Sequence, residues 1–278
     1  MNQKTVIKTE DLWFTYPGGV QALRDVNIEI KRREFIGIIG QNGSGKTTLA
    51  KHFNGLFKPT RGKVLVDGVD TRKVSIAELS KKVGYVFQNP DHQIFGRTIL
   101  EEVSFGLKNV GVPDEKLEEM VKEALRRVDL DLPLSHSPHL VSAGQKHRIA
   151  IASVLSMKPD VVILDEPTMG LDYRRCVEMM EFASELNRDG CTIILITHDI
   201  ALIADYTERV IVLKDGEVIG DGPTKRVLSN SKLLMKTYLY PPQITELAQS
   251  LSHIGVPFDI IKVSEMVKYL TGTATIRR

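Results

Sequence analysis

Residues Phe35–Thr48 read FIGIIGQNGSGKTT, and this stretch decides the fold. Its first part, Phe35–Ile39, is a short apolar run of β-branched character that predicts one buried strand. Three glycines follow, and Thr47–Phe53 then has the pattern of a helix. A strand, a glycine-rich turn and a helix in this order predict one unit of an α/β fold.

The turn matches the phosphate-binding loop motif G-x-x-x-x-G-K-[ST] at Gly40, Gly45, Lys46 and Thr47. Glycines let backbone N–H groups curl around phosphates, and the helix that follows adds its N-terminal dipole. Lys46 can then reach the β- and γ-phosphates, while the Thr47 hydroxyl can bind Mg²⁺. The alternative is a chance glycine-rich turn, but the flanking strand and helix supply the context that the motif requires. The sequence therefore predicts that the chain binds a nucleoside triphosphate through Gly40, Gln41, Asn42, Gly43, Ser44, Gly45, Lys46, Thr47 and Thr48.

Composition and charge narrow the class of protein. The 278 residues are 42% hydrophobic and 26% charged, with a formal net charge of +2, which allows one or two globular domains. No polybasic face supports nucleic-acid binding. We expect a chain without a signal peptide or membrane span, because no apolar run approaches ~18 residues. Cys176 and Cys191 lack metal spacing and are expected to be reduced, as in a cytosolic protein.

Apolar segments downstream of the loop predict a mainly parallel α/β core. Val83–Phe87, Val161–Leu164 and Thr192–Thr197 are short runs of the kind found in strands covered on both faces. Val210–Leu213 and Glu217–Ile219 flank a Lys-Asp-Gly turn and predict a hairpin. We expect ligands to bind where the parallel strands end.

Two regions depart from this core. Residues 5–32 alternate between apolar and polar in pieces around Pro17-Gly18-Gly19, which predicts a small antiparallel sheet. From about residue 100 to 130 the pattern is helical and interrupts the alternation of strands and helices. We predict an inserted helical subdomain over roughly residues 89–155.

The composition shifts again beyond about residue 224, where Tyr240-Pro241-Pro242 marks a break. Short helical pieces follow, such as Ile244–Leu251 and Val263–Leu270. We therefore divide the chain into a nucleotide-binding domain, residues 1–225, and a C-terminal appendage, residues 226–278, as a candidate dimerisation region.

Polar residues suited to chemistry follow three of the predicted strands. Asp165 and Glu166 come directly after an apolar strand, where Asp165 would hold Mg²⁺ and Glu166 would polarise the attacking water. His198 ends another strand and could donate to a γ-phosphate, although a lone histidine is more often structural. Gln88 ends a third strand and could position water or Mg²⁺ through its amide. A solvated strand end is the alternative for Asp165 and Glu166.

Together these residues resemble the ATP-binding subunit of ABC transporters over roughly residues 5–225. Gly40–Thr48 resembles the Walker A motif, Val161–Glu166 the Walker B strand with its catalytic glutamate, and Thr168–Asp172 the D-loop. The resemblance implies that Gln88 is the Q-loop glutamine and that His198 is the switch histidine. It also implies that Tyr16 stacks on adenine, whereas the sequence pattern alone leaves a core role equally open. The resulting assignments are catalytic Glu166, His198 and Gln88; metal-binding Thr47, Gln88 and Asp165; and nucleotide-binding Tyr16, the loop residues, Ser142, Gly144 and Gln145.

The segment Val141–Ala150, VSAGQKHRIA, resembles the ABC signature that is usually written LSGGQ. It separates this family from other phosphate-loop proteins. Val141 replaces leucine, and Ala143 replaces the first glycine, which adds a methyl group where backbone approaches phosphate. We expect a weakened or specialised signature. A plain helix cap by Ser142, before a helix starting near Gln145, is compatible with this role.

A narrower resemblance rests on Val86–Phe95, VFQNPDHQIF. This loop is similar to that of the ATPases of energy-coupling factor (ECF) importers, which take up vitamins or transition-metal ions. The segment from Tyr240 also resembles the C-terminal region of that group, with less specificity.

The resemblance implies Mg²⁺-dependent ATP hydrolysis that drives import through membrane subunits on other chains. Two ATPase chains would sandwich ATP, each offering its signature to the other, and Ala143 favours a heterodimer. The expected partners are a second ATPase, a transmembrane coupling subunit and a substrate-binding membrane component, with no nucleic acid. The expected location is the cytoplasmic face of the cell membrane.

Three alternatives are open. A soluble ABC ATPase of DNA repair or translation would show long heptads or basic arms, and neither is present in the sequence. A phosphate-loop kinase or GTPase would lack the segment Val141–Gln145. An importer with two ordinary membrane subunits is the alternative within transport. The sequence does not name the transported substrate.

Overall fold

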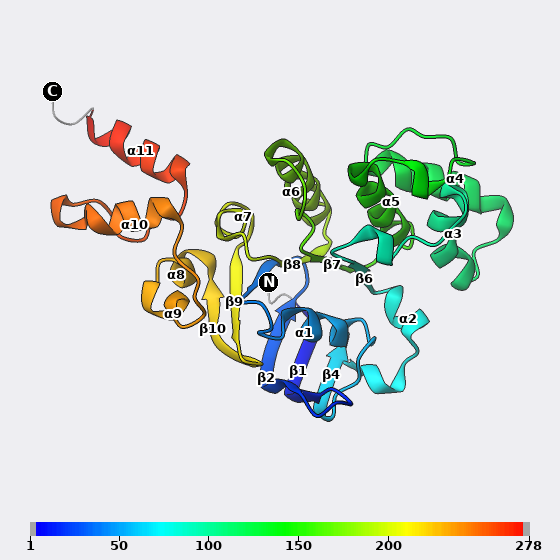
Figure 1. The fold of residues 1–278 in the computed structure, drawn as a ribbon, viewed down its shortest axis with the longest axis horizontal. Helices are drawn as coiled ribbons and strands as arrows, with labels where there is room; N and C mark the ends of the chain where they lie inside the picture. Colours follow the sequence, from blue (N-terminus) through cyan, green and yellow to red (C-terminus); the bar gives the residue numbers. More distant parts are fainter. Residues whose placement is uncertain (1–3, 275–278) are drawn as a thin grey trace.

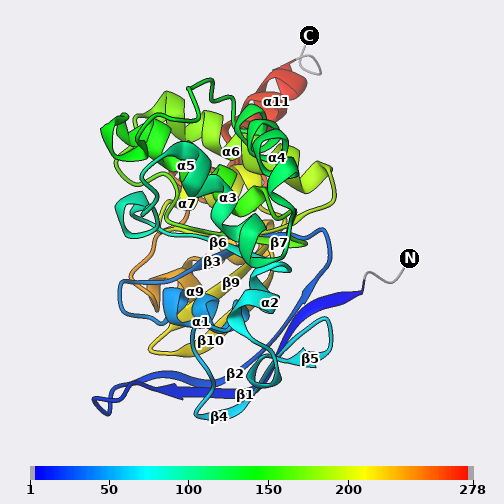
Figure 2. The same cartoon turned by 90° about the vertical axis from the view of Figure 1, so that its right-hand side faces the viewer.

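The computed structural model describes residues 4–274. It contains two β-sheets, of which the larger lies between the smaller sheet and a layer of helices (Figures 1 and 2). The smaller sheet has four strands in the order β2-β1-β4-β5, all antiparallel. Its two long strands meet around the turn at Pro17-Gly18-Gly19, as predicted. Their bounds are β1 Thr5–Thr15, β2 Gln21–Lys31, β4 Arg61–Val66 and β5 Val69–Asp70.

The larger sheet has six strands in the order β10-β9-β3-β8-β7-β6. All neighbours are parallel except β10, which pairs with β9 as the predicted hairpin. The mainly parallel α/β core is therefore confirmed. The strands are β3 Phe35–Ile39, β6 Val83–Val86, β7 Val161–Asp165, β8 Thr192–Ile196, β9 Arg209–Lys214 and β10 Glu217–Pro223.

Alternation along these strands assigns side chains to two separate apolar cores. On β7, Val161 and Ile163 face one core, while Val162 and Leu164 face the other. The first core lies between the two sheets and includes α1, Lys46–Phe53. The second lies under the helices on the opposite face of the large sheet (Figure 2). Because both faces are covered, β3, β6, β7 and β8 are buried along their whole length and show no polar alternation.

Helices between β6 and β7 fill the region predicted as a helical insertion. They gather to one side of the large sheet (Figure 1). Leu117, Val121 and Leu125 of α4, together with its C-cap Val128, are all buried and lie on one face of the helix. The elements are the 3₁₀ turn η2 Pro90–His92, α3 Ile99–Asn109, α4 Asp114–Arg127, the 3₁₀ turn η3 Pro138–Leu140 and α5 Ala143–Leu155.

Helix α6, Tyr173–Arg188, lies between this helical region and α7, Ile200–Tyr206 (Figure 1). It follows β7 directly and packs on β8. Its N-terminus is therefore close to the end of β7, where Asp165 and Glu166 lie. Two short elements, η1 Thr71–Lys73 and α2 Ile76–Ser80, connect β5 with β6.

The C-terminal helices lie at the far side of β10 from the helical region (Figure 1). Helices α10 and α11 share a small core of their own around Ala248, Val256, Ile260 and Met266. Within residues 4–274, no helix is long and apolar enough to cross a membrane, and both cysteines are free. The elements are α8 Thr224–Leu228, α9 Ser231–Met235, α10 Gln243–Ser250, η4 Ser252–Ile254 and α11 Val263–Ala274.

Candidate nucleotide site

The loop between β3 and α1 has a backbone that only glycine tolerates at two places. Gly40 has φ of 151°, and a Cβ built on it would lie 2.2 Å from the carbonyl oxygen of Leu213. Gly45 has φ of 102°, and its Cβ would lie 2.8 Å from the carbonyl oxygen of Ala22. Gly45 is also the N-cap of α1 and offers no side chain to the first N–H groups of that helix. Those N–H groups are available to an anion.

Two buried side chains of the loop are arranged for a phosphate. Lys46 donates from Nζ to the carbonyl oxygens of Gly40, at 2.8 Å, and Gln41, at 3.0 Å. Burial lowers the pKa of Lys46, and the carboxylates of Asp165 and Glu166 oppose that shift. The Ser44 hydroxyl is fully buried, and no residue within 4–274 hydrogen-bonds to it. A buried hydroxyl without a partner inside an N–H-rich loop fits a phosphate oxygen.

Asp165 ends β7 directly beside this loop. Its Oδ2 accepts hydrogen bonds from the hydroxyls of Tyr85, at 2.6 Å, and Thr47, at 3.0 Å. Burial raises the pKa of Asp165, and these two donors oppose the shift. Burial and the neighbouring carboxylate also raise the pKa of Tyr85, which keeps its proton on the donating oxygen.

The pair of Thr47 and Asp165 fits Mg²⁺ better than a metal held wholly by the protein. Within residues 4–274, no group of three histidine, cysteine, aspartate or glutamate side chains could hold a metal ion. Mg²⁺ commonly takes one or two protein ligands and completes its shell with water and substrate phosphates. A hydroxyl and a carboxylate beside a phosphate loop supply that donor set.

Glu166, the next residue, has a left-handed backbone with φ of 50°. For a residue other than glycine this costs roughly 1–2 kcal/mol, and such strain is typical of functional positions. The Glu166 N–H donates to the carbonyl oxygen of Ile196 at 2.8 Å, which holds the turn against β8. Both carboxylate oxygens lie 3.0 Å from Nδ1 of His198. His198 follows β8, so two neighbouring strands bring this pair together.

The other two predicted site residues outside the signature, Gln88 and Tyr16, contact different parts of the site. Gln88 is exposed just after β6, and its Nε2 lies 2.9 Å from Sδ of Met169, in the predicted D-loop. Tyr16 shares a hydrogen bond of 2.9 Å with the hydroxyl of Thr48 at the phosphate loop. Its ring packs edge-on against Phe14 and Phe57. Stacking of Tyr16 on adenine stays a prediction.

The predicted signature residues lie at the start of α5, apart from this cluster. Helix α5 begins at Ala143, two residues before the expected start, because Ser142 and Gln145 form a reciprocal capping box. The Ser142 hydroxyl accepts from the Gln145 N–H, and Gln145 Oε1 accepts from the Ser142 N–H at 3.0 Å. The methyl group of Ala143 is exposed, so it strains no packing within this chain.

Tyr85 is a residue of this site that was not predicted from the sequence, where Val83–Phe87 has only the pattern of a buried strand that leads to Gln88. One signal was available: a tyrosine in a doubly covered strand needs a partner for its hydroxyl. The sequence does not show that the partner is Asp165, which is 80 positions away.

Comparison with known proteins agrees with this geometry. The family model described as "ABC transporter" matches residues 23–169 of the chain. The energy-coupling factor transporter ATP-binding protein EcfA of Methanocaldococcus jannaschii is 43% identical over 249 residues, covering 89% of each chain. The chain belongs to the ABC transporter family. Its resemblance to the ATPases of that family is thereby confirmed.

Other ABC relatives place the chain in the same group. It is 45% identical over 262 residues to a putative ABC transporter ATP-binding protein of Caldanaerobacter subterraneus subsp. tengcongensis, covering 94% of this chain. The chain spans only 45% of that relative's length, and 43% of a similar relative from Methanosarcina acetivorans. Among solved structures, cbiO1 of Clostridium perfringens, part of the ABC transporter complex cbiONQ, is 40% identical with a TM-score of 0.74. That comparison covers 88% of this chain and 99% of cbiO1.

Proposed function

We propose that this chain is the ATP-binding and ATP-hydrolysing subunit of an ECF-type ABC importer. The observation that carries the proposal is the contact between the Glu166 carboxylate and Nδ1 of His198, at 3.0 Å. Glu166 directly follows Asp165, which is hydrogen-bonded to Thr47 of the phosphate loop. A carboxylate, an imidazole and a metal-binding pair then converge on one phosphate site. The similarity to EcfA and to cbiO1 supports the ECF type. Vitamins or transition-metal ions are the proposed substrate class.

In this proposal the chain's own residues divide the work between binding and chemistry. When ATP binds, Lys46 donates to the β- and γ-phosphates in place of its two carbonyl acceptors. A phosphate oxygen then becomes the hydrogen-bond partner of the Ser44 hydroxyl. Glu166 accepts the proton of the attacking water as a general base. His198 holds the Glu166 carboxylate and donates to the γ-phosphate, and Gln88 positions the water.

Thr47, Asp165 and Gln88 are the proposed residues around Mg²⁺. When bound, Mg²⁺ neutralises charge on the phosphates. A lone pair of the Thr47 hydroxyl would bind the metal while its O–H continues to donate to Asp165, and Tyr85 would also hold Asp165 in place.

We further propose a dimer of two ATPase chains with ATP between them. The start of α5, with Ser142, Gly144 and Gln145, would close over ATP bound to the phosphate loop of the other chain. Tyr16 would stack on the adenine of ATP bound to its own loop. Residues 1–225 would form the nucleotide-binding domain, with the helical subdomain at about 89–155. Residues 226–278 would form an appendage for dimerisation.

The membrane partners in this proposal are a transmembrane coupling subunit and a substrate-binding component. The chain would then lie at the cytoplasmic face of the membrane as a peripheral subunit. Co-purification from membranes would identify these subunits. An ABC importer of another class, or a soluble ABC ATPase, would be indicated if neither component were recovered.

Two substitutions separate binding from chemistry. Lys46→Ala should weaken ATP binding because the polyphosphate loses a charge-assisted contact. Glu166→Gln should keep ATP binding and lower the turnover rate by roughly tenfold to a thousandfold, more than the loss of a peripheral contact would give. Nucleotide affinity and steady-state hydrolysis in the assembled complex measure the two effects. Hydrolysis by Glu166→Gln at the unmutated rate would show that Glu166 is not the base.

A further inference from the structure

The first turn of α6 carries two arginines in a place where stability does not favour them. Arg174 and Arg175 follow the N-cap Asp172, and no acidic residue is present in that turn. The N-terminal end of a helix carries partial positive charge, so cations there are unfavourable. We therefore expect an interaction of each arginine that offsets its unfavourable position at the helix N-terminus.

Arg174 has such an interaction within the chain, but Arg175 does not. Nε of Arg174 donates to Glu178, one turn along α6, at 3.1 Å. Arg175 forms one ion pair, between its Nε and Asp172 at 3.4 Å, and both side chains are more than half exposed. An exposed pair of this kind adds little stability. Within residues 4–274, neither Nη1 nor Nη2 of Arg175 has a hydrogen bond or ion pair.

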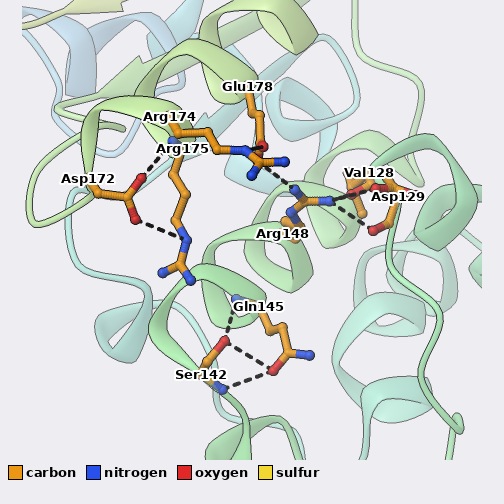
Figure 3. A network of polar contacts seen from close by, with 9 residues as sticks. All are labelled: Val128, Asp129, Ser142, Gln145, Arg148, Asp172, Arg174, Arg175 and Glu178. Atoms are coloured by element: carbon orange, nitrogen blue, oxygen red, sulfur yellow. Dashed lines mark hydrogen bonds and ion pairs between the residues drawn. The ribbon is translucent and has the colours of Figure 1, made fainter.

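The guanidinium of Arg175 lies instead against the predicted signature. A Cβ built on Gly144 would be 3.6 Å from Nη1 of Arg175. Figure 3 shows Arg175 extending from α6 toward the first turn of α5, whereas Arg174 points toward Glu178. Arg148, from α5, is engaged elsewhere, with the carbonyl oxygens of Val128 and Asp129 and with Glu178.

Two backbone donors lie beside this guanidinium. The capping box uses the N–H groups of Ser142 and Gln145. In the part of the chain that the structure describes, the N–H groups of Ala143 and Gly144 have no acceptor. Nζ of Lys146 forms an ion pair with Asp91 at 2.7 Å. Among residues 4–274, the cation without a partner for its Nη atoms at this helix end is Arg175, which lines a groove of about 860 Å³ between α5 and α6.

We propose that Arg175 is a nucleotide-binding residue that acts across the ATPase dimer. Its Nη atoms donate to the triphosphate of ATP held on the opposing chain's phosphate loop, beside the N–H groups of Ala143 and Gly144. A guanidinium suits this position because it donates in a planar fork and stays charged. The inference rests on the proposed dimer, and it adds a charged contact that the signature motif itself does not contain.

The test measures ATP-dependent dimerisation of the full-length chain in the Glu166→Gln background, with itself or with its partner ATPase, by analytical ultracentrifugation. Arg175→Ala should raise the dimer dissociation constant by roughly tenfold or more, the size expected for a charged hydrogen bond. Arg174→Ala is the matched control and should stay within about twofold. Binding of ATP to the isolated chain should not change in either variant, because that binding uses the chain's own loop.

Two further variants separate charge from structure. Arg175→Lys should restore part of the dimer affinity, and its advantage over Arg175→Ala should shrink as salt is raised. Equal, salt-independent weakening by Arg175→Lys and Arg175→Ala would overturn a charge contact with ATP. Thermal unfolding of each variant checks that the fold is retained.

Gly144→Glu distinguishes failure of this inference from failure of the proposed dimer. A carboxylate at the start of α5 should repel the opposing triphosphate and abolish the ATP-dependent dimer. If Gly144→Glu still dimerised as its parent does, the arrangement in which α5 meets the opposing ATP would be wrong. If Gly144→Glu abolished the dimer while Arg175→Ala matched Arg174→Ala, only the role of Arg175 would be wrong.

Discussion

At the scale of single residues, Asp165 is the carboxylate that we propose binds a metal, and two hydroxyls hold it in place. Its Oδ2 is bound by two hydroxyls, and only one of them, Thr47, is itself a proposed metal ligand. The other, Tyr85, comes from the adjacent strand β6. The tyrosine hydroxyl can therefore keep the carboxylate in place independently of the metal-binding Thr47.

This arrangement predicts a specific effect of Tyr85→Phe. The variant keeps the ring in the core and removes one hydrogen bond of roughly 1.5–3 kcal/mol, so the carboxylate is held less firmly. We expect the Mg²⁺ concentration that supports half-maximal ATP binding to rise by about threefold to tenfold. Titration of a fluorescent ATP analogue with Mg²⁺, and with no metal, checks this. An equal loss of affinity without metal would point to damage of the core.

At the scale of elements, the loop between β6 and α3 divides into an internal part and an exposed part. Gln93 accepts from the Phe87 N–H at 3.1 Å and donates to the Ala150 carbonyl oxygen at 2.9 Å. It therefore ties the loop to α5. Phe95 is 59% exposed and packs edge-on against Phe105, which is 48% exposed. Because Gln93 holds the loop in place and the two aromatic rings are exposed, this surface is suited to contact with another protein.

We expect substitutions in this loop to impair transport more than nucleotide binding. Phe95→Ala should lower transport by the reconstituted complex with no change in ATP affinity or in unfolding temperature. Gln93→Ala should also lower stability, by roughly 1–3 kcal/mol, because it leaves the part-buried Phe87 N–H without an acceptor. Asn89→Ala should fall between these, since Asn89 caps the turn η2. Equal loss of ATP affinity and transport in all three variants would indicate a local folding role.

At the scale of the whole molecule, we predict the state of assembly by comparing this chain's phosphate site with its predicted signature segment. The phosphate loop, Asp165, Glu166 and His198 are all in place, whereas the signature carries Ala143. We predict a heterodimer in which another ATPase with a more regular signature completes this chain's site. The added methyl group should cost on the order of 1 kcal/mol where it meets phosphate. Gradient sedimentation of Glu166→Gln with ATP, alone and with the partner ATPase, measures this. A homodimer that forms as readily as the mixed dimer would leave Ala143 neutral.

The stability of the whole chain should depend on pH through His52. This residue of α1 is fully buried among Phe14 and Phe57, and burial lowers its pKa from 6.5 to about 4. Below pH 6.5 His52 binds a proton in the unfolded chain, whereas in the folded chain it stays neutral until the pH falls to about 4. The free energy of unfolding should therefore fall by about 1.4 kcal/mol per pH unit across that range. Urea unfolding as a function of pH checks the assignment. The free energy of unfolding of His52→Gln should lose this pH dependence, whereas His253→Gln, which changes an exposed histidine, should keep it.

Much of the fold and of the candidate site could be predicted from local sequence. A strand, a glycine turn and a helix are decided by residues within a few positions of one another, so Phe35–Thr48 was sufficient for the phosphate loop. Apolar strands followed by polar residues likewise located Asp165, Glu166 and His198. The start of α5 was misplaced by two residues because a capping box is recognised only when both of its partners are considered.

Sequence alone thus determined which residues could bind a nucleotide, because glycine conformation, helix dipole and residue chemistry act locally. The tertiary structure alone decided which of them meet. The order β3-β8-β7-β6 places Tyr85 on Asp165 and His198 beside Glu166, and the packing of α6 beside α5 brings Arg175 to Gly144. These contacts join residues 31 to 80 positions apart in the chain, and no local preference encodes them. They follow from burying both faces of one sheet, which is a property of the folded chain as a whole.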